Sequence, residues 1–202
     1  LFIYRVLINF VLIFSPFIIV YRLLNNKEDY SRVKEKLGFI NKLRNNGKLI
    51  WFHGSSVGEV LSIFPLLEKL EKNKKISQIL ITTNTLSSAS ILKKINFKKT
   101  LHQYFPIDSN IVVKKFLNHW KPDCVYLIES EIWPNSILEI KERNIPLILL
   151  NARITKKTYL KWKGMPNFSR NLFEKFDLCL CQNSETSFYL KKLGSKTIKN
   201  LG

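Results

Sequence analysis

Six short apolar runs, separated by segments with helical periodicity, constrain what this chain can fold into more than any other feature. The runs are apolar on both faces of a strand, and such strands form parallel sheets that helices cover on both sides. Crossovers between parallel strands are right-handed, so the alternation predicts an α/β fold: a Rossmann-like, doubly wound parallel sheet. The predicted strands are residues 49–52, 79–81, 101–105, 124–128, 147–150 and 178–181.

The segments between the runs predict helices. An apolar stripe from Val57 to Leu70 indicates one amphipathic helix after the first strand. Ser109 is placed to cap a helix that continues to Trp120. Further helices are expected over residues 87–94 and 132–143. In doubly wound sheets the ligand sits beyond the carboxyl ends of the strands, so the loops that follow the strands are the places to look for a site.

The first 24 residues differ from the rest of the chain. Nineteen of them are apolar, counting tyrosine, and the exceptions are Arg5, Asn9, Ser15, Pro16 and Arg22. The stretch between the two arginines would form about 24 Å of helix, short of the roughly 30 Å hydrocarbon core of a bilayer. Both arginine side chains can extend toward the membrane surface. The pattern therefore fits either a helix that crosses the bilayer or a helix that is deeply inserted in the interface. We therefore expect residues 1–24 to form a membrane-anchor helix.

Basic residues follow this apolar segment at once. Residues 22–48 contain eight Lys/Arg and three Asp/Glu, a net charge of +5. Positive charge beside an apolar segment predicts that this side stays cytoplasmic. The three cysteines are too few for a disulfide scaffold and indicate a reducing compartment. We expect residues 25–47 to be a basic juxtamembrane segment and residues 48–202 to be the Rossmann-like domain, on the cytoplasmic side of the membrane.

The charge of the whole chain is strongly positive. It has 33 Lys+Arg against 15 Asp+Glu, a formal net charge of +18. Such a surface favours polyanions, namely nucleic acid, anionic lipid or phosphorylated substrates. Lys, Asn and Ile are all abundant, so a coding bias toward A and T is the alternative explanation of the charge.

Polar residues follow the first two predicted strands. The first loop, His53 to Glu59, is built of small residues that lead into a helix, as an anion or sugar site requires. Glu59 also stands three residues after Ser56, the spacing of a capping box, so a structural role is the alternative. The second loop, Thr82-Thr83-Asn84-Thr85, offers hydroxyl and amide groups either to a ligand or to ordinary turn and helix-capping bonds.

Two later loops carry charged residues. Glu129 and Glu131 follow the fourth strand, and in an extended chain they face the same way, so repulsion would raise the pKa of one of them. The alternative is a pair of solvated loop carboxylates. After the fifth strand, Asn151-Ala152-Arg153 suits either an anion clamp or an ordinary surface arginine.

Taken in order, these segments resemble the N-terminal domain of the 3-deoxy-D-manno-octulosonic acid (Kdo) transferases, the glycosyltransferases of lipid A. The resemblance covers nearly the whole chain, and it departs at Leu86-Ser87-Ser88-Ala89, where the family usually carries a glycine. The matching segments are Tyr4-Arg5, W-F-H-G-S-S-V-G-E at 51–59, I-T-T-N-T at 81–85, Y-F-P-I-D at 104–108, W-K-P-D at 120–123, E-S-E-I-W-P-N at 129–135 and N-A-R-I at 151–154.

The resemblance implies a GT-B glycosyltransferase, in which two Rossmann-like domains face each other across a cleft. It implies CMP-Kdo as donor and lipid IVA as acceptor, in lipopolysaccharide biosynthesis at the cytoplasmic face of the cell inner membrane. No cofactor or metal is expected, in keeping with a sequence that has no D-x-D motif. This chain would be the acceptor-binding half, and the C-terminal donor-binding domain, acting in cis, would lie outside these 202 residues.

The resemblance also assigns roles to residues. Glu59 is implied to be the general base that takes the proton of the acceptor 6′-hydroxyl, with inversion at the anomeric carbon. The basic and aromatic stretch of residues 153–175 suits a membrane surface or a phosphate. The implied substrate-binding residues are Ser55, Ser56, Gly58, Thr82, Thr83, Glu129, Glu131, Asn151 and Arg153.

Two other classes of protein compete with this interpretation. One is a nucleic-acid-binding protein, which the charge and the aromatic residues suggest but which no RRM, KH or helix-turn-helix pattern supports. The other is a membrane-associated half-domain that binds the acceptor without catalysis. The partners that we expect are lipid IVA, CMP-Kdo and anionic inner-membrane lipid, and not nucleic acid.

Overall fold

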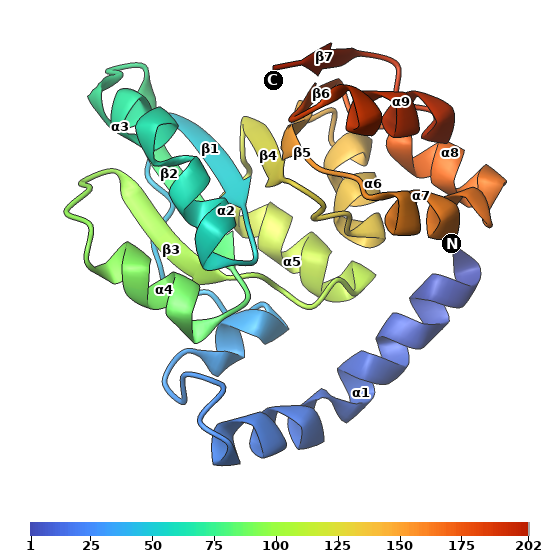
Figure 1. Ribbon diagram of the computed structural model, residues 1–202. Helices are drawn as coiled ribbons and strands as arrows, with labels where there is room; N and C mark the ends of the chain where they lie inside the picture. The colour runs from blue at the N-terminus through green and yellow to red at the C-terminus, as the bar shows by residue number, and fades with distance from the viewer. Residues whose placement is uncertain (202) are drawn as a thin grey trace.

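A computed structural model describes residues 1–201, and within them the predicted doubly wound parallel sheet is confirmed. Its strands lie side by side in the order β3-β2-β1-β4-β5-β6-β7, and every pairing is parallel (Figure 1). They are β1 (Lys48–His53), β2 (Ile76–Thr83), β3 (Thr100–Tyr104), β4 (Cys124–Ile128), β5 (Leu147–Ala152), β6 (Leu178–Cys181) and β7 (Ile198–Asn200).

The order of the strands contains a reversal. The chain runs outward from β1 through β2 to β3, returns to place β4 on the other side of β1, and then runs outward to β7. Neighbouring connections therefore leave β1 and β4 in opposite directions, and ligands of such sheets bind at the carboxyl ends of these two strands. This switch point lies between the loop after His53 and the loop after Ile128.

Helices connect the strands and cover both faces of the sheet. Ser109 accepts a bond from the backbone N–H of Val112 and caps the helix that ends at Trp120, as predicted. The helices are α2 (Val57–Ser62), α3 (Phe64–Lys72), α4 (Leu86–Lys93), α5 (Asn110–Trp120), α6 (Pro134–Glu142), α7 (Lys156–Lys163), α8 (Pro166–Phe173) and α9 (Ser184–Leu193).

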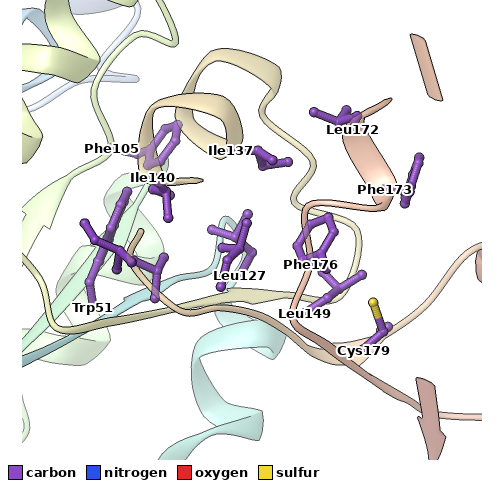
Figure 2. Packing of buried hydrophobic residues seen from close by; sticks show 14 of the residues in the cluster. Trp51, Phe105, Leu127, Ile137, Ile140, Leu149, Leu172, Phe173, Phe176 and Cys179 are labelled. Carbon is purple, nitrogen blue, oxygen red and sulfur yellow. The ribbon is translucent and has the colours of Figure 1, made fainter. Parts of the chain in front are cut away.

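Successive strand residues divide the core into two layers. On β1, Leu49 and Trp51 belong to the larger layer, which includes α5, α6, α8 and α9, while Phe52 belongs to the smaller layer with α2, α3 and α4. Figure 2 shows the larger layer, where Trp51, Leu127 and Leu149 of three adjacent strands lie opposite Ile137 and Ile140 of α6. This alternation follows from the period of two along a strand.

One predicted helix is wrong in its extent. The apolar stripe of residues 57–70 belongs to two helices, α2 and α3, which meet at Ile63. Pro65 stands in the first turn of α3, where its missing N–H does no harm, but the same ring would break a continuous helix. Helices α7, α8 and α9 and strand β7, which lie in and beyond the basic stretch of residues 153–175, were not predicted.

Residues 25–47 lie against the domain. A short 3-10 helix, η1 (Val33–Leu37), sits beside β3, and the Nη2 of Arg32 donates to the carbonyl of His102 at 3.0 Å. The Nε2 of Gln78 donates to the carbonyl of Leu43, and the Nε of Arg44 donates to the carbonyl of Trp120. Residues 25–47 are therefore fixed to β2, β3 and the end of α5.

The N-terminal apolar segment forms one helix, α1 (Phe2–Leu24), with Pro16 inside it. By length and composition this helix is long and apolar enough to cross a membrane, and most of its surface is exposed. It runs along the outside of the domain, with its first turn near α8 and its last turn near the 25–47 segment (Figure 1).

Candidate active site

The loop after β1 places Glu59 at the switch point of the sheet. Ser56 caps α2, and its hydroxyl accepts from the backbone N–H of Glu59 at 3.3 Å. In return the Oε1 of Glu59 accepts from the hydroxyl of Ser56 at 2.7 Å and from its backbone N–H at 3.3 Å, so the capping box is present. The Oε2 accepts the backbone N–H of Ser55 at 2.8 Å. A carboxylate has about four lone-pair positions, so these bonds orient Glu59 and leave Oε2 able to accept one more proton donor.

Two glycines flank this carboxylate and differ in what surrounds them. A Cβ on Gly54 would lie 2.9 Å from Cδ1 of Ile128 and 3.2 Å from Cβ of Glu59, so this glycine allows the close packing of β1, β4 and the base of α2. A Cβ on Gly58 would meet nothing within 4 Å. Gly58 therefore leaves the surface of the first turn of α2 open at its own position.

Glu131 turns toward the sheet and is held by two ring nitrogens. Its Oε2 lies 2.9 Å from Nε2 of His53 and accepts the indole N–H of Trp133 at 2.7 Å. Burial by itself raises the pKa of Glu131, but the bonds with His53 and Trp133 outweigh it and leave the pKa below its usual value. His53 in turn is fully buried and stacks on Phe105 with ring centroids 3.7 Å apart.

Glu129 and Glu131 do not face the same way, which corrects the prediction of an extended pair. Glu129 has a φ of +55°, in the left-handed region, so the chain turns sharply between the two carboxylates. The predicted rise in pKa is present at Glu129, and its first cause is burial, followed by the charge of Glu59. Glu131 contributes less to that rise, and the Arg153 guanidinium opposes it.

The loop after β5 brings Arg153 beside Glu129. Asn151 also has a φ of +55°, and the backbone N–H of Arg153 donates to the carbonyl of Glu129 at 3.4 Å. The side chain of Arg153 is exposed. Glu59, Glu129 and Arg153 thus form a charged group at the carboxyl edge of the sheet, with a cation beside two carboxylates.

The hydroxyls of Thr82 and Thr83 bond to ring nitrogens inside the domain. Both are fully buried at the end of β2. The hydroxyl of Thr82 accepts the indole N–H of Trp51 at 2.8 Å and lies 3.0 Å from Nδ1 of His53, while the hydroxyl of Thr83 lies 2.9 Å from Nε2 of His102. These threonines position ring nitrogens, and their role in binding substrate stays a prediction.

The other two residues of this loop, Asn84 and Thr85, stabilise the backbone close to the site. Asn84 donates to the hydroxyl of Ser55 at 2.7 Å, and Thr85 caps α4 by accepting from the backbone N–H of Ser88. The hydroxyl of Ser88 donates to the carbonyl of Ser55 at 3.1 Å. The loop therefore supports Ser55, whose N–H in turn holds Glu59.

Three residues that shape this edge were not predicted as site residues. His53 and Trp133 hold Glu131, and only their places next to the predicted loops could have drawn attention to them. Asp108, at the end of the Y-F-P-I-D segment, is buried and receives the backbone N–H groups of Asn135 and Ser136 at 2.9 and 2.8 Å. It thus caps α6 from another part of the chain.

In the part of the chain that the structure describes, no group of three or more His, Cys, Asp or Glu side chains is arranged to hold a metal ion. The side chains at the switch point instead offer an oriented carboxylate and an exposed guanidinium. Such an edge can accept a proton from a hydroxyl and can bind an anionic group.

The strand order and the site at the switch point define a Rossmann-like domain of the GT-B type. Among solved structures, the chain is similar to a UDP-N-acetylglucosamine 2-epimerase, with a TM-score of 0.55 and 15% identity over 78% of this chain and 46% of that one. It is also similar to the UDP-GlcNAc 2-epimerase of Neisseria meningitidis, with a TM-score of 0.53, 14% identity and coverage of 77% and 46%. At these identities the likeness shows the fold alone.

The sequence profile of the family described as 3-deoxy-D-manno-octulosonic-acid transferase (kdotransferase) matches residues 31–202, and the chain belongs to this family. It is 37% identical to the 3-deoxy-D-manno-octulosonic acid transferase of Rickettsia bellii over 96% of this chain and 47% of that protein. It is also 37% identical to a probable mitochondrial transferase of the same name from Arabidopsis thaliana, over 74% of this chain and 34% of that protein. The chain thus spans half the length of these relatives or less.

Proposed function

We propose that this chain supplies the acceptor half of an enzyme that transfers Kdo from CMP-Kdo to lipid IVA in lipopolysaccharide biosynthesis. Membership of the Kdo transferase family supports glycosyl transfer of Kdo as the reaction class. The single observation that carries the mechanism is the oriented carboxylate of Glu59, whose Oε2 accepts the backbone N–H of Ser55 and keeps a lone pair for another donor.

The proposed reaction is a direct displacement with inversion. The acceptor hydroxyl forms a bond to the anomeric carbon of Kdo while the bond from that carbon to the CMP phosphate breaks, and the electron pair leaves with CMP. Oε2 of Glu59 takes the hydroxyl proton as the oxocarbenium-like centre develops. Three donors hold the carboxylate in place, so little reorganisation is needed when the proton moves.

The remaining substrate contacts are assigned to the same edge. Ser55, Ser56 and Gly58 line the acceptor side next to the base, and Glu129 and Asn151 shape the opposite side of the site. Arg153 is the cation suited to a phosphate or carboxylate of a substrate. Glu131 contributes to the substrate site indirectly, by positioning His53 and Trp133, since both ring nitrogens bond to its Oε2.

We assign three regions to this work. Residues 1–24 anchor the chain in the inner membrane, residues 25–47 tie the anchor to the domain, and residues 48–202 bind the acceptor on the cytoplasmic side. A donor-binding domain that holds CMP-Kdo completes the site in cis, in keeping with relatives about twice as long as this chain or longer.

The test is Glu59→Gln in a protein that carries the donor domain. The amide keeps the shape of the side chain but cannot take the proton, so kcat should fall by about 10²–10⁴ with little change in KM for the acceptor. Glu71→Gln is the matched control. Glu71 also accepts two backbone N–H groups and a hydroxyl, from Lys98, Lys99 and Thr100, but it lies at the opposite edge of the sheet.

The two variants separate catalysis from structure. Glu71→Gln should lower the melting temperature and leave kcat within a few-fold of the parent protein. A folded Glu59→Gln protein with near-normal turnover would leave Glu59 with its capping role alone. A complete protein that binds lipid IVA but transfers no Kdo would instead favour the non-catalytic acceptor-binding module.

A further inference from the structure

The polar side of α1, where both arginines, Tyr4 and Ser15 lie among apolar residues, faces the domain. Ser15 is buried, and the half-buried positions recur at spacings of three and four residues. This stripe includes every charged residue of the helix, Arg5 and Arg22, together with Tyr4. The half-buried residues are Tyr4, Arg5, Ile8, Leu12, Ile19, Arg22 and Leu23.

The opposite side of α1 is apolar from end to end except at Asn9 and Pro16. Phe2 is 79% exposed at one end, Phe17 is 74% exposed near the middle and Leu24 is 79% exposed at the other end. The remaining exposed apolar residues between them are Ile3, Val6, Leu7, Phe10, Val11, Ile13, Phe14, Ile18, Val20 and Tyr21. A soluble surface helix shows the reverse arrangement, with its apolar side toward the core.

The first turn of α1 is tied to the start of α6. The hydroxyl of Tyr4 donates to Oδ2 of Asp108 at 2.7 Å, and the Nε of Arg5 donates to Oδ1 of Asn135 at 3.1 Å. Asp108 and Asn135 are themselves buried and bonded to each other, since the backbone N–H of Asn135 donates to Asp108. Leu1 lines a cavity of about 300 Å³ with residues of α6 and α8.

The last turn of α1 is tied to the 25–47 segment. The Nε of Arg22 donates to Oε1 of Glu28 at 2.6 Å, and the Nζ of Lys36 donates to the same oxygen at 2.6 Å. Glu28 is buried, and Lys36 also donates to the carbonyl of Asn84 in the loop after β2. Tyr4 is therefore held by the domain and Arg22 by the 25–47 segment that packs on it, although about 27 Å of helix separates the two residues.

We propose that α1 is an in-plane anchor, which lies flat between the domain and one leaflet of an anionic membrane and does not cross it. A spanning helix would carry Tyr4 to the far side of the bilayer, where it could not reach Asp108. The apolar side of α1 fits the acyl region, and the net +5 of residues 22–48 fits the anionic headgroups beside it. This inference rests on the proposed membrane attachment and adds its geometry.

Cysteine cross-linking of the membrane-bound chain tests the inference. Ile8 and Ile107 line one cavity of about 270 Å³ between α1 and the domain, and neither takes part in the polar ties. In the double variant Ile8→Cys/Ile107→Cys, a short bis-maleimide should link the two cysteines in intact membranes. Ile13→Cys/Ile107→Cys is the matched control, because Ile13 is 66% exposed on the outward side and should not be linked.

Two further results bear on the geometry. Tyr4→Phe should lower the yield of the Ile8–Ile107 link while the protein stays in the membrane fraction. The in-plane anchor is overturned if the two cysteines of Ile8→Cys/Ile107→Cys are linked in detergent but not in membranes. This holds whatever the reactivity of Ile8→Cys toward a monofunctional maleimide in membranes. Recovery of the intact chain in the soluble fraction is a different result, and it would refute the membrane attachment itself.

Discussion

The carboxylates at the switch point differ in the groups that hold them, and this difference supports the roles that we propose for them. Glu59 is held by backbone N–H groups and a hydroxyl, and its Oε2 keeps room for another donor. Glu131 places one oxygen between His53 and Trp133. A base must accept a proton that a substrate brings, so Glu59 suits catalysis and Glu131 suits positioning.

The pKa of Glu131 leads to a prediction about stability and pH. Its pKa is lowered in the folded protein, because the bonds from His53 and Trp133 outweigh burial. A lowered pKa stabilises the fold at neutral pH, and this contribution disappears as the pH falls through the folded value. Glu131→Gln should therefore reduce the free energy of unfolding by about 1–3 kcal/mol at pH 7, and the difference should shrink below about pH 4.

Chemical denaturation at several pH values measures this difference. Trp133→Phe removes one of the two ring donors and should give a smaller loss with the same pH trend. A gap between the parent protein and Glu131→Gln that stays constant down to pH 3 would show that the carboxylate charge does not matter there.

Gly58 offers a test of how closely a ligand approaches the base. Because a Cβ at this position meets nothing within 4 Å, Gly58→Ala should leave the fold intact and could stabilise the helix by about 0.5–1 kcal/mol. If the acceptor occupies that space, the same methyl group should lower transfer at least ten-fold. Melting temperature and turnover of one preparation measure both effects, and a stable variant with unchanged turnover would remove Gly58 from the acceptor site.

At the scale of helices and strands, an element was predicted correctly where the residues that determine it are close together in the sequence. The limits of β4 and β6 and the Ser109 cap of α5 were predicted correctly, because apolar runs and capping residues act locally. The apolar stripe of residues 57–70 continues through the break between α2 and α3, because apolar periodicity does not depend on the backbone N–H that Pro65 lacks. Helices α7 and α8 were not predicted, because residues 153–175 were interpreted by their basic and aromatic composition and not by their periodicity.

Deletion of α1 tests the anchor as an element. Removing residues 1–24 should move the chain from the membrane pellet to the soluble fraction, because the exposed apolar side is lost while the domain core is unaffected. The intact chain should resist a high-salt wash, which weakens attachment by charge alone. A deleted chain that stays in the pellet after that wash would contradict the assignment of the anchor, and release of the intact chain by salt would mean that attachment is electrostatic.

At the scale of the whole molecule, topology made the site predictable. Parallel strands end at one edge, so loops far apart in sequence, such as those of Glu59, Glu129 and Arg153, were expected together and do meet. Their detail was not predictable, because the left-handed turn at Glu129 and the burial of Thr82 and Thr83 depend on tertiary contacts. The polar side of α1 likewise has meaning only once Asp108 and Asn135 are in place.

The reaction product is the most direct test of the proposed function. A protein that joins this chain to its donor domain would be incubated with CMP-Kdo and lipid IVA, and the lipid product analysed by mass spectrometry and NMR. We predict that the acceptor gains Kdo at its 6′-hydroxyl, that CMP is released, and that the new linkage has the anomeric configuration opposite to that of the donor. A folded protein that binds both substrates and leaves lipid IVA unchanged, or that retains the donor configuration, would contradict an inverting transfer driven by Glu59.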